Sequence, residues 1–495
     1  MHDTVRFILA GKVEEVRACD PTRTVLEYLR EDRGLTGTKE GCAEGDCGAC
    51  TVVTVELYKG GIRYRSINSC IQFLATLDGK QLLTVEDLEA ADGNIEPELH
   101  AVQKAMVEQH GSQCGFCTPG FVMSLFAMFH NDRERDAGRQ DIDLGLAGNL
   151  CRCTGYAPIV RAAEQALKAD RSDRFSTVEK QTIEQLKSIQ NTSTLDISGP
   201  NGRFIAPRTL AELCDLRDTH PEAVLVAGAT DVGLWVTKQN RRLKTVIYLG
   251  EVQELKQIND DGQTLNIGAA VSYTDATEAI VKIYPAFLPL IQRIGGSQVR
   301  NAGTIGGNIA NGSPIGDMPP GLIAAGAKLD LYSTRGRRSI DLQDYFIDYG
   351  KQDLQPGECV EQIRLPRPPE DHLFAVYKVS KRFEQDISAV CGAFSMQLEG
   401  KVITNARVCF GGMAATPKRA TACEHALEGK TWNQETIDMA MQAMLEDFTP
   451  LTDMRASASY RMRVAQNLLQ RFFFEQHATP YPVRLGLRYA EDKQR

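Results

Sequence analysis

Four cysteines near the start of the chain have the order and spacing of iron–sulfur ligands. Cys42, Cys47 and Cys50 form a C-x4-C-x2-C pattern, and Cys70 follows after nineteen residues. Four thiolates in this order can hold the two irons of a [2Fe–2S] cluster. The stretch 41–50 is rich in glycine, which lets the backbone turn tightly and bring N–H groups close to the sulfurs. A disulfide loop is the structural alternative, but the spacing and the glycines together favour a cluster.

A second group of cysteines offers four more thiolates from two short motifs. Cys114 and Cys117 are separated by two residues, and Cys151 and Cys153 by one. Each pair precedes a segment with helical character, and the free N–H groups at a helix N-terminus favour negatively charged sulfur. Zinc also accepts four thiolates, so a zinc site is the alternative. The short C-x-C pair and the cluster motif upstream favour a second [2Fe–2S] cluster.

Hydrophobic periodicity predicts the elements that position these cysteines. Alternating apolar residues predict strands, and apolar residues three or four apart predict helices. We expect a β-hairpin over 4–16, a helix over 24–30, strands over 51–55 and 62–67, and helices over 99–110, over 121–129 and up to about 168. The first cysteine group would then lie in a loop of a small mixed domain, and the second at the heads of helices.

Two glycine-flanked turns further along the chain could bind a diphosphate. Gly228–Gly233 follows a predicted buried strand over 223–227, and TIGGN lies at 304–308. Glycines permit close approach, while backbone N–H groups and threonine hydroxyls donate to phosphate oxygens. Asp317 could accept a hydrogen bond from a sugar or ribityl hydroxyl. No G-x-G-x-x-G follows a predicted strand, so a Rossmann dinucleotide site is not supported.

These patterns divide the chain into several domains. The stretch 169–200 is polar and charged, which predicts a linker with at most a helical turn near 183–189. Towards the C-terminus, alternating strands are followed by amphipathic helices near 435–446 and 459–474, which predicts a sheet covered on one face by helices. The expected parts are a ferredoxin-like domain (1–90), a helical cluster domain (91–168), the linker, an α/β domain (201–370), an α+β domain (371–480) and a tail (481–495). The expected fold class is therefore multidomain α+β.

Length and composition limit the classes of function. A chain of 495 residues is too long for one core, and its net charge of −8 argues against a nucleic-acid partner. Met1 is not followed by a basic and apolar leader, which predicts a cytoplasmic protein with reduced thiols. Residues 111–131 lack charged side chains but contain two cysteines and Pro119, so we expect a buried helix rather than a membrane span. The remaining cysteines lack paired spacing and are expected to be small buried residues: Cys19, Cys214, Cys359, Cys391, Cys409 and Cys423.

Six motifs are shared with one known family. They are GCAEGDCGAC at 41–50, QCGFCTPG at 113–120, GNLCRCTGY at 148–156, LVAGATDVG at 225–233, TIGGNIANGSPIGD at 304–317 and SKRFEQDISAV at 380–390. With them, nearly the whole chain resembles the small subunit of two-subunit bacterial xanthine dehydrogenases, which are molybdenum hydroxylases. The resemblance implies a β-grasp ferredoxin-like domain and a helical-bundle [2Fe–2S] domain. It further implies an FAD-binding domain of the vanillyl-alcohol-oxidase/CO-dehydrogenase-flavoprotein type and a C-terminal α+β domain.

The resemblance also assigns roles to residues. The quartet of Cys42, Cys47, Cys50 and Cys70 would hold the cluster nearer the flavin, and the other quartet the cluster nearer molybdenum. The implied FAD-binding residues are Leu225, Val226, Ala227, Gly228, Ala229, Thr230, Asp231, Val232, Ile294, Thr304, Ile305, Gly306, Gly307, Asn308, Asp317, Val360 and Lys378. The family usually has an aromatic residue where this chain has Ile294.

The function implied by the resemblance is electron relay. A partner chain carrying the molybdenum cofactor would convert hypoxanthine to xanthine and xanthine to urate, and this chain would pass the electrons through two clusters and FAD to NAD⁺. No residue of this chain need act as a general acid or base. The family implies an (αβ)2 heterotetramer, with no membrane partner. Alternatives are the equivalent subunit of another molybdenum hydroxylase acting on an N-heterocycle or aldehyde, an oxidase that uses O2, and a standalone iron–sulfur flavoprotein.

Overall fold

The first cysteine quartet is carried by a five-stranded mixed sheet. The computed structural model describes residues 1–89, 99–131 and 137–476. The sheet contains β1 (Val5–Leu9), β2 (Lys12–Val16), β3 (Thr51–Tyr58), β4 (Gly61–Asn68) and β5 (Gln81–Leu83). Their order is β2-β1-β5-β3-β4, with β1 and β5 parallel and the other pairs antiparallel. The predicted hairpin of β1 and β2 is confirmed, and it turns at Ala10 and Gly11, both with positive φ. The short helix α1 (Val25–Glu27) precedes the cysteine loop.

The ferredoxin-like sheet is buried on both faces. Along β3, Val53 and Val55 belong to a core shared with the helical layer, whereas Val52 belongs to a core shared with Phe204 and Val246. Successive side chains of a strand point to opposite faces, so one strand supplies both cores. The segment before residue 90 therefore shares apolar cores with the segments that follow it.

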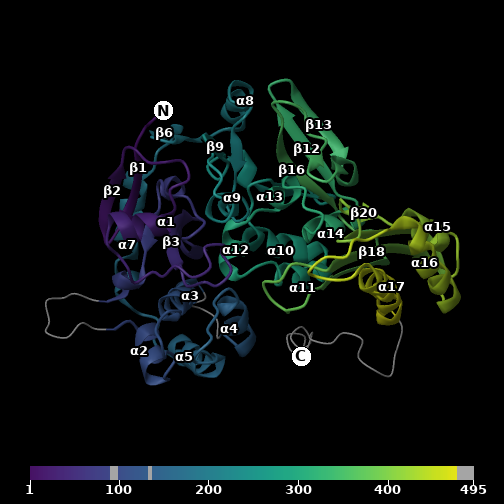
Figure 1. Cartoon of the computed structure of the whole chain (residues 1–495), viewed down its shortest axis with the longest axis horizontal. Coiled ribbons are helices and arrows are strands. Elements are labelled where there is room, and N and C mark those ends of the chain that lie inside the picture. Colours follow the sequence, from purple (N-terminus) through teal and green to yellow (C-terminus); the bar gives the residue numbers. More distant parts are fainter. Residues whose placement is uncertain (90–98, 132–136, 477–495) are drawn as a thin grey trace. The chain divides into compact units, whose positions relative to one another are not determined.

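Four helices form the layer on one face of this sheet. They are α2 (Ala101–Glu108), α3 (Thr118–Asn131), α4 (Arg139–Leu146) and α5 (Tyr156–Lys168), and they gather together in Figure 1. The central helix α3 packs on β3 and β4, and its Phe121, Phe126 and Phe129 are fully buried. The uncharged stretch 111–131 is thus a buried helix led by a cysteine loop, as expected. Within residues 1–89, 99–131 and 137–476, no helix combines the length and the apolar character needed to cross a bilayer.

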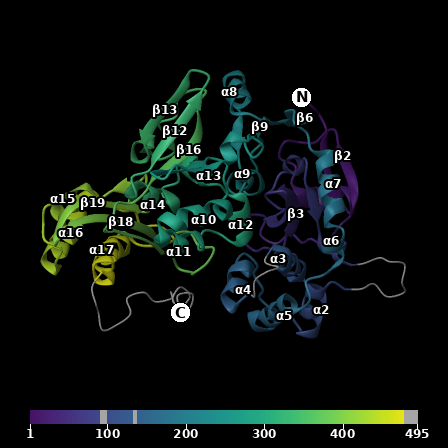
Figure 2. The ribbon, with the colours of Figure 1, turned by 180° about the vertical axis from the view of Figure 1, so that it is seen from behind.

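The stretch 169–200 is more ordered than a linker. It contains α6 (Arg174–Thr177), α7 (Glu179–Ile189) and the strand β6 (Leu195–Gly199). In α7, Thr182, Leu186 and Ile189 lie on one face and are buried, and the helix packs against the ferredoxin-like sheet (Figure 2). Its polar residues occupy the outer face, which explains why composition alone suggested a linker.

The residues expected to form one FAD-binding domain are divided between two compact units. Unit 1 comprises residues 1–253 and 295–303, and unit 2 comprises residues 254–294 and the described residues from 304 onward. Unit 1 contains a second sheet, of order β6-β7-β9-β8. Its other strands besides β6 are β7 (Gly202–Ala206), β8 (Val224–Val226) and β9 (Thr245–Tyr248). The helices α8 (Leu210–Thr219), α9 (Val232–Thr237) and α12 (Ser297–Ala302) also belong to this unit. Thr209 caps α8 by accepting a hydrogen bond of 3.2 Å from Glu212 N.

Unit 2 contains two larger sheets. The first, of order β10-β11-β16-β12-β13, contains β10 (Ile258–Asp260), β11 (Thr264–Gly268), β12 (Lys328–Ser333), β13 (Gly336–Asp341) and β16 (Cys359–Pro366). The helices α10 (Tyr273–Ile283), α11 (Leu288–Ile291), α13 (Ile305–Ala310) and α14 (Met318–Ala324) and the small hairpin of β14 (Phe346–Asp348) and β15 (Lys351–Gln352) accompany it.

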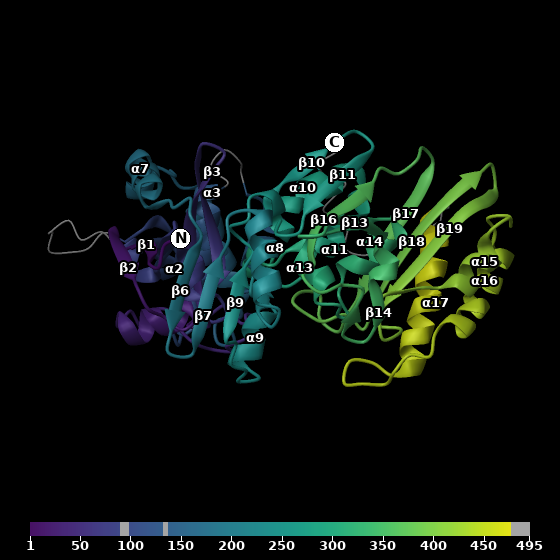
Figure 3. The same cartoon turned by 90° about the horizontal axis from the view of Figure 1, so that it is seen from above.

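The second sheet of unit 2 confirms the expected C-terminal α+β arrangement. Its strands are β17 (His372–Val379), β18 (Val390–Glu399), β19 (Val402–Gly411) and β20 (Lys418–Arg419), followed by α15 (Thr421–Leu427), α16 (Gln434–Asp447) and α17 (Ala458–Glu475). The helices α15 and α17 pack on the sheet, and α16 packs on both of them (Figure 3). The multidomain α+β class is confirmed, and the predicted tail 481–495 lies outside the described residues.

We expect Phe126→Ala to destabilise the helical layer by about 3–5 kcal/mol, because the buried ring leaves a cavity between α3 and its neighbours. The ring centroid of Phe126 lies 4.9 Å from that of Phe175 and 5.2 Å from that of His100, so several partners lose contact at once. Urea unfolding followed by circular dichroism would measure the change. Val107→Ala, at a position 65% exposed on α2, is the control and should shift stability by no more than about 0.5 kcal/mol.

Candidate iron–sulfur centres and flavin loops

The first cysteine quartet forms one connected group of sulfurs. Cys42, Cys47 and Cys50 lie in the loop before β3, and Cys70 follows the end of β4. Cys50 Sγ lies 3.2 Å from Cys70 Sγ, and Cys42 is in hydrogen-bond contact with the thiols of Cys47 and Cys70. Gly45 lies in this loop and has a φ of 77°. Its carbonyl oxygen accepts a hydrogen bond of 2.9 Å from Nδ2 of the buried Asn68.

Backbone N–H groups converge on this quartet in the way that a cluster requires. Glu44, Asp46 and Cys47 donate to Cys42 Sγ over 3.5, 3.4 and 3.3 Å. The thiols of Cys47 and Cys70 also donate to Cys42, and together these bonds lower the pKa of Cys42. The pKa values of Cys47 and Cys70 are raised by the same bonds, because a second thiolate would lie beside the first. All four sulfurs can ionise together only with positive metal charge between them, so this donor set fits a [2Fe–2S] cluster.

The second quartet draws its sulfurs from the loops that precede α3 and α5. Cys153 Sγ lies 3.5 Å from Cys114 Sγ, and both residues are exposed. Burial, followed by its hydrogen bond to Cys151, raises the pKa of the Cys117 thiol to about 12. Cys151 Sγ accepts a hydrogen bond from Thr154 N over 3.4 Å. The structure therefore brings the C-x2-C and C-x-C pairs together, with backbone N–H donors directed at the buried Cys151.

The two cysteine loops are in direct backbone contact. Leu150 N donates to Cys47 O over 3.0 Å, and Asn149 Nδ2 donates to Gly48 O over 3.1 Å. Cys151 directly follows Leu150 in the sequence. A single hydrogen bond therefore connects Cys47 of the first quartet to the residue that precedes Cys151 of the second. Asn149 and Leu150 were not among the sequence candidates, although both lie within the GNLCRC motif.

We expect Gly48→Ala to separate the two loops and to lower the iron content of both centres. A Cβ at Gly48 would lie 2.0 Å from Gly148 O, a backbone atom that has no easy way to move, and the φ of Gly48 is 70°. Gly60→Ala is a matched control, because Gly60 has a φ of 84° and open space around its Cβ position. The control carries the same kind of backbone strain, about 1 kcal/mol, without the contact. Iron and acid-labile sulfide analysis compares the two variants; equal iron in both would refute the role given to the contact.

The first expected flavin loop connects β8 to α9 in unit 1. It comprises residues 225–232, and Ala229 within it has a φ of 57°. A Cβ at Gly228 would lie 1.9 Å from Ala302 O, at the end of α12. This glycine makes room for another backbone segment, and its expected role beside a phosphate stays a prediction.

The second expected loop lies in unit 2 and opens α13. Thr304 Oγ1 accepts a hydrogen bond of 3.0 Å from Gly307 N and so caps this helix. A Cβ at Gly306 would lie 2.5 Å from the backbone of Ala269, which again shows a glycine required by close packing. Asn308 Oδ1 accepts from Met318 N over 3.4 Å and ties α13 to the start of α14. Ile305 is buried in this arrangement.

Two further FAD candidates are joined in a buried ion pair. Lys378 Nζ donates to Asp317 Oδ2 over 2.5 Å, and Ser388 Oγ donates to Asp317 Oδ1 over 2.5 Å. A buried charge needs such partners, because desolvation would otherwise neutralise it. Ser388 was missed by the sequence reasoning, although it lies in the SKRFEQDISAV motif. The remaining candidates, Ile294 and Val360, are both buried apolar side chains.

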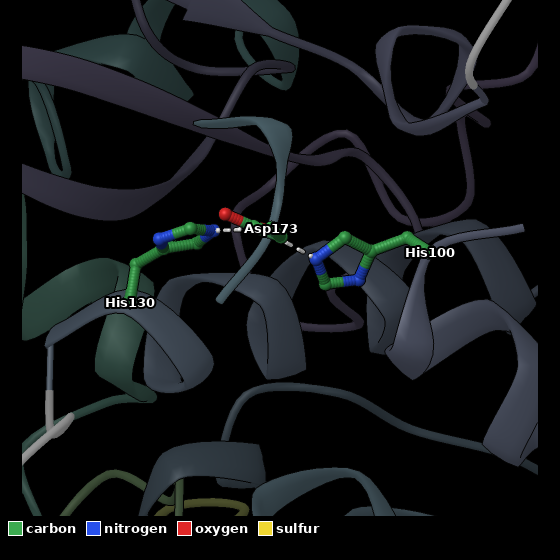
Figure 4. Close-up of side chains that lie close together, drawn as sticks. All are labelled: His100, His130 and Asp173. Carbon is green, nitrogen blue, oxygen red and sulfur yellow. Dashed lines mark hydrogen bonds and ion pairs between the residues drawn. The ribbon is translucent and has the colours of Figure 1, made fainter. Parts of the chain in front are cut away.

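A histidine–aspartate triad joins the start of α2 to the end of α3 within the helical layer (Figure 4). Nε2 atoms of His100 and His130 lie 2.9 and 3.0 Å from Asp173 Oδ2. Burial would raise the pKa of Asp173, but the bonds from both imidazoles outweigh it and hold that pKa well below its usual range. Such a group resembles a metal site, yet His100 Nδ1 accepts a hydrogen bond from Val102 N over 3.2 Å. The proton of the neutral ring must therefore be on Nε2, which makes His100 a donor to Asp173 and not a metal ligand.

The cysteines outside the two quartets behave as predicted. All six are buried, and none forms a disulfide among the described residues: Cys19, Cys214, Cys359, Cys391, Cys409 and Cys423. Burial raises the pKa of the Cys19 thiol to about 11, and it likewise raises the pKa values of Cys391 and Cys423. The thiols of Cys19, Cys391 and Cys423 therefore stay protonated at neutral pH, and all six cysteines are small buried side chains.

Four protein-family models match the chain in sequence order. They are a 2Fe-2S iron-sulfur cluster binding domain at residues 7–70, a [2Fe-2S] binding domain at 84–164, an FAD binding domain in molybdopterin dehydrogenase at 199–368 and a CO dehydrogenase flavoprotein C-terminal domain at 375–476. The second match falls on the loops of Cys114, Cys117, Cys151 and Cys153 and selects [2Fe–2S] over the zinc alternative. Two cluster domains and an FAD domain are therefore present in one chain.

Similar proteins include xanthine dehydrogenases. The xanthine dehydrogenase of Emericella nidulans is 32% identical over 96% of this chain, which corresponds to 38% of that relative. Xanthine dehydrogenase 1 of Arabidopsis thaliana is 31% identical over 86% of this chain and 36% of its own length. The chain thus spans well under half of these relatives. Among solved structures, a carbon monoxide dehydrogenase from Hydrogenophaga pseudoflava is 28% identical, with a TM-score of 0.54 over 56% of this chain and 99% of the matched one.

Proposed function

The chain carries the [2Fe–2S] and FAD domains of the molybdenum hydroxylase family, and on this premise we propose that it is the electron-transfer subunit of a xanthine dehydrogenase. The observation that carries the proposal is the extent of the likeness. Similarity to a xanthine dehydrogenase runs over 96% of the chain, across both cluster domains, the FAD domain and the C-terminal domain. The partner would be a chain that holds the molybdenum cofactor and oxidises hypoxanthine and xanthine, in an (αβ)2 heterotetramer.

The residues of this chain would hold the cofactors and set their surroundings. The two cysteine quartets would ligate the clusters. The candidates for binding FAD are residues 225–232 and 304–308, Asp317 and Lys378. When bound, the clusters carry single electrons, and FAD exchanges them for the electron pair that nicotinamide takes up. The N–H donors on Cys42 Sγ stabilise negative charge on that centre, which tunes its potential. We assign no general acid or base to this chain.

Anaerobic reduction by NADH tests the acceptor. We expect NADH to bleach both the flavin and the iron–sulfur absorption of the purified chain, because the transfer from flavin to NAD⁺ can run in reverse. Cys70→Ala is a matched variant: it should keep the flavin response and lose about half of the iron, since one of two quartets is broken. Bleaching by dithionite but not by NADH, with the partner bound as well as without it, would contradict NAD⁺ as the acceptor and favour O2.

Substrate choice is tested on the complex with its partner chain. The structural likeness to a carbon monoxide dehydrogenase, which covers 99% of that chain, favours a second candidate, the equivalent subunit of another molybdenum hydroxylase. A complex that reduces its clusters with xanthine supports the first candidate. Reduction only by another N-heterocycle or an aldehyde supports the second. Isolation of the native protein without any molybdenum-containing partner chain would instead indicate a standalone carrier.

A further inference from the structure

Four buried polar side chains form a network between the two cysteine loops. Thr51, Ser124, Asn149 and Gln298, called here the polar hub, are 1%, 1%, 3% and 1% exposed. They come from β3, from α3, from the loop before Cys151 and from α12, and all four belong to unit 1. Amide and hydroxyl groups this far from water need hydrogen-bond partners, so their arrangement is tightly constrained.

Gln298 Nε2 has two N–H donors and lies within hydrogen-bond distance of all three other members of the polar hub. Its Nε2 lies 3.0 Å from Thr51 Oγ1, 3.2 Å from Ser124 Oγ and 3.0 Å from Asn149 Oδ1. Asn149 Oδ1 also accepts from Ser124 Oγ over 2.6 Å, which leaves Asn149 Nδ2 to donate to Gly48 O and Thr51 Oγ1. Gln298 thereby determines which way the Asn149 amide faces, since Asn149 Oδ1 is held on the Gln298 side.

The polar hub borders the backbone that joins the two centres. Thr51 directly follows the ligand Cys50, and Asn149 is followed by Leu150, whose N–H donates to Cys47 O. Gly148 leaves room for Gln298, because a Cβ there would lie 2.0 Å from Gln298 Oε1. A substitution at Gln298 would therefore first alter the position of Asn149 and then weaken the hydrogen bond between Leu150 N and Cys47 O.

The segment that carries Gln298 is anchored firmly to unit 1. Ser297 N donates to Ala147 O over 2.8 Å, and Ser297 Oγ donates to Gly145 O over 3.0 Å. At the other end of α12, Asn301 Nδ2 donates to Ser66 O over 3.0 Å. These bonds fix the backbone of α12, so that the Gln298 side chain reaches the hub from a rigid support.

We propose that Gln298 is a positioning residue that holds the Asn149–Leu150 stretch against the Cys47–Gly48 loop and so sets the coupling between the two [2Fe–2S] centres. Its role would be to orient Asn149 and keep the Leu150 N–H bonded to Cys47 O. The proposal rests on the two-cluster part of the proposed function and is independent of the substrate and of the final acceptor. Gln298 itself touches no reacting atom.

Gln298→Glu tests the proposal in the full chain. Glutamate keeps the size of the side chain but replaces the donor with an acceptor, which faces the oxygens of Thr51, Ser124 and Asn149. At iron content equal to that of the wild type, we expect the Leu150 amide to exchange its hydrogen about tenfold faster. In the dithionite-reduced chain, we expect the magnetic interaction between the clusters, read from electron paramagnetic resonance, to change. Gln190→Glu is a control for the same substitution at an exposed position, where Gln190 Nε2 donates to Gly79 O over 2.7 Å; both readings should match the wild type.

Unchanged Leu150 exchange and an unchanged cluster interaction in iron-replete Gln298→Glu would overturn the proposal, whatever happens to thermal stability. Ser124→Ala is the second variant, for the case in which Gln298→Glu does not fold. It removes one acceptor of Gln298 and one donor to Asn149, so faster Leu150 exchange supports the proposal and wild-type exchange overturns it. A chain that fails to react with NADH but shows these effects contradicts the proposed acceptor and leaves the role of Gln298 intact.

Discussion

The close approach of two backbone segments at Gly48 is the constraint on which the electron-carrying half of the molecule depends. Gly48 faces Gly148 and Asn149 so closely that no side chain fits between them, and Gly120 faces Gly48 O in the same way. Glycines at 48, 120 and 148 therefore let loops from different parts of the sequence share hydrogen bonds instead of side-chain contacts. Because a hydrogen bond joins Leu150 to Cys47, the separation of the two cysteine loops is determined by backbone geometry and not by flexible side chains.

The contact between the two cysteine loops is stable because the elements that carry both loops share buried apolar cores. The ferredoxin-like sheet presents Val53 and Val55 to the helices and Val52 to the sheet of β6–β9. A sheet buried on both faces cannot tilt relative to either neighbour without exposing apolar surface, which costs about 25 cal/mol per Å². The helix α7, expected to be a linker, adds Leu186 and Ile189 to the same core. Electron-transfer centres need fixed distances, and this shared burial provides them.

Elsewhere in the fold, carboxylates shielded from solvent connect separate elements through hydrogen bonds and ion pairs. Asp173 joins the ends of α2 and α3 through two imidazoles, and Asp317 joins α14 to the strand that carries Lys378. In each case both oxygens of the carboxylate have donors, which a buried carboxylate requires. The Asp173 triad shows why convergent ligand-type atoms are insufficient for a metal site: the partner of the other ring nitrogen decides what the histidine can do.

The sequence by itself determined the cofactor class and most of the local structure. Cysteine spacing, the alternation in β1 to β4 and the apolar period of α3, α16 and α17 are local properties, so they can be read from short windows. Tertiary structure alone decided how those pieces meet. Gln298 bonds to Asn149 across 149 residues, Gly228 is required by Ala302, and the segment 295–303 joins unit 1 although its neighbours in sequence belong to unit 2. Such contacts depend on which surfaces come together when the layers pack. A short stretch of sequence therefore cannot predict them.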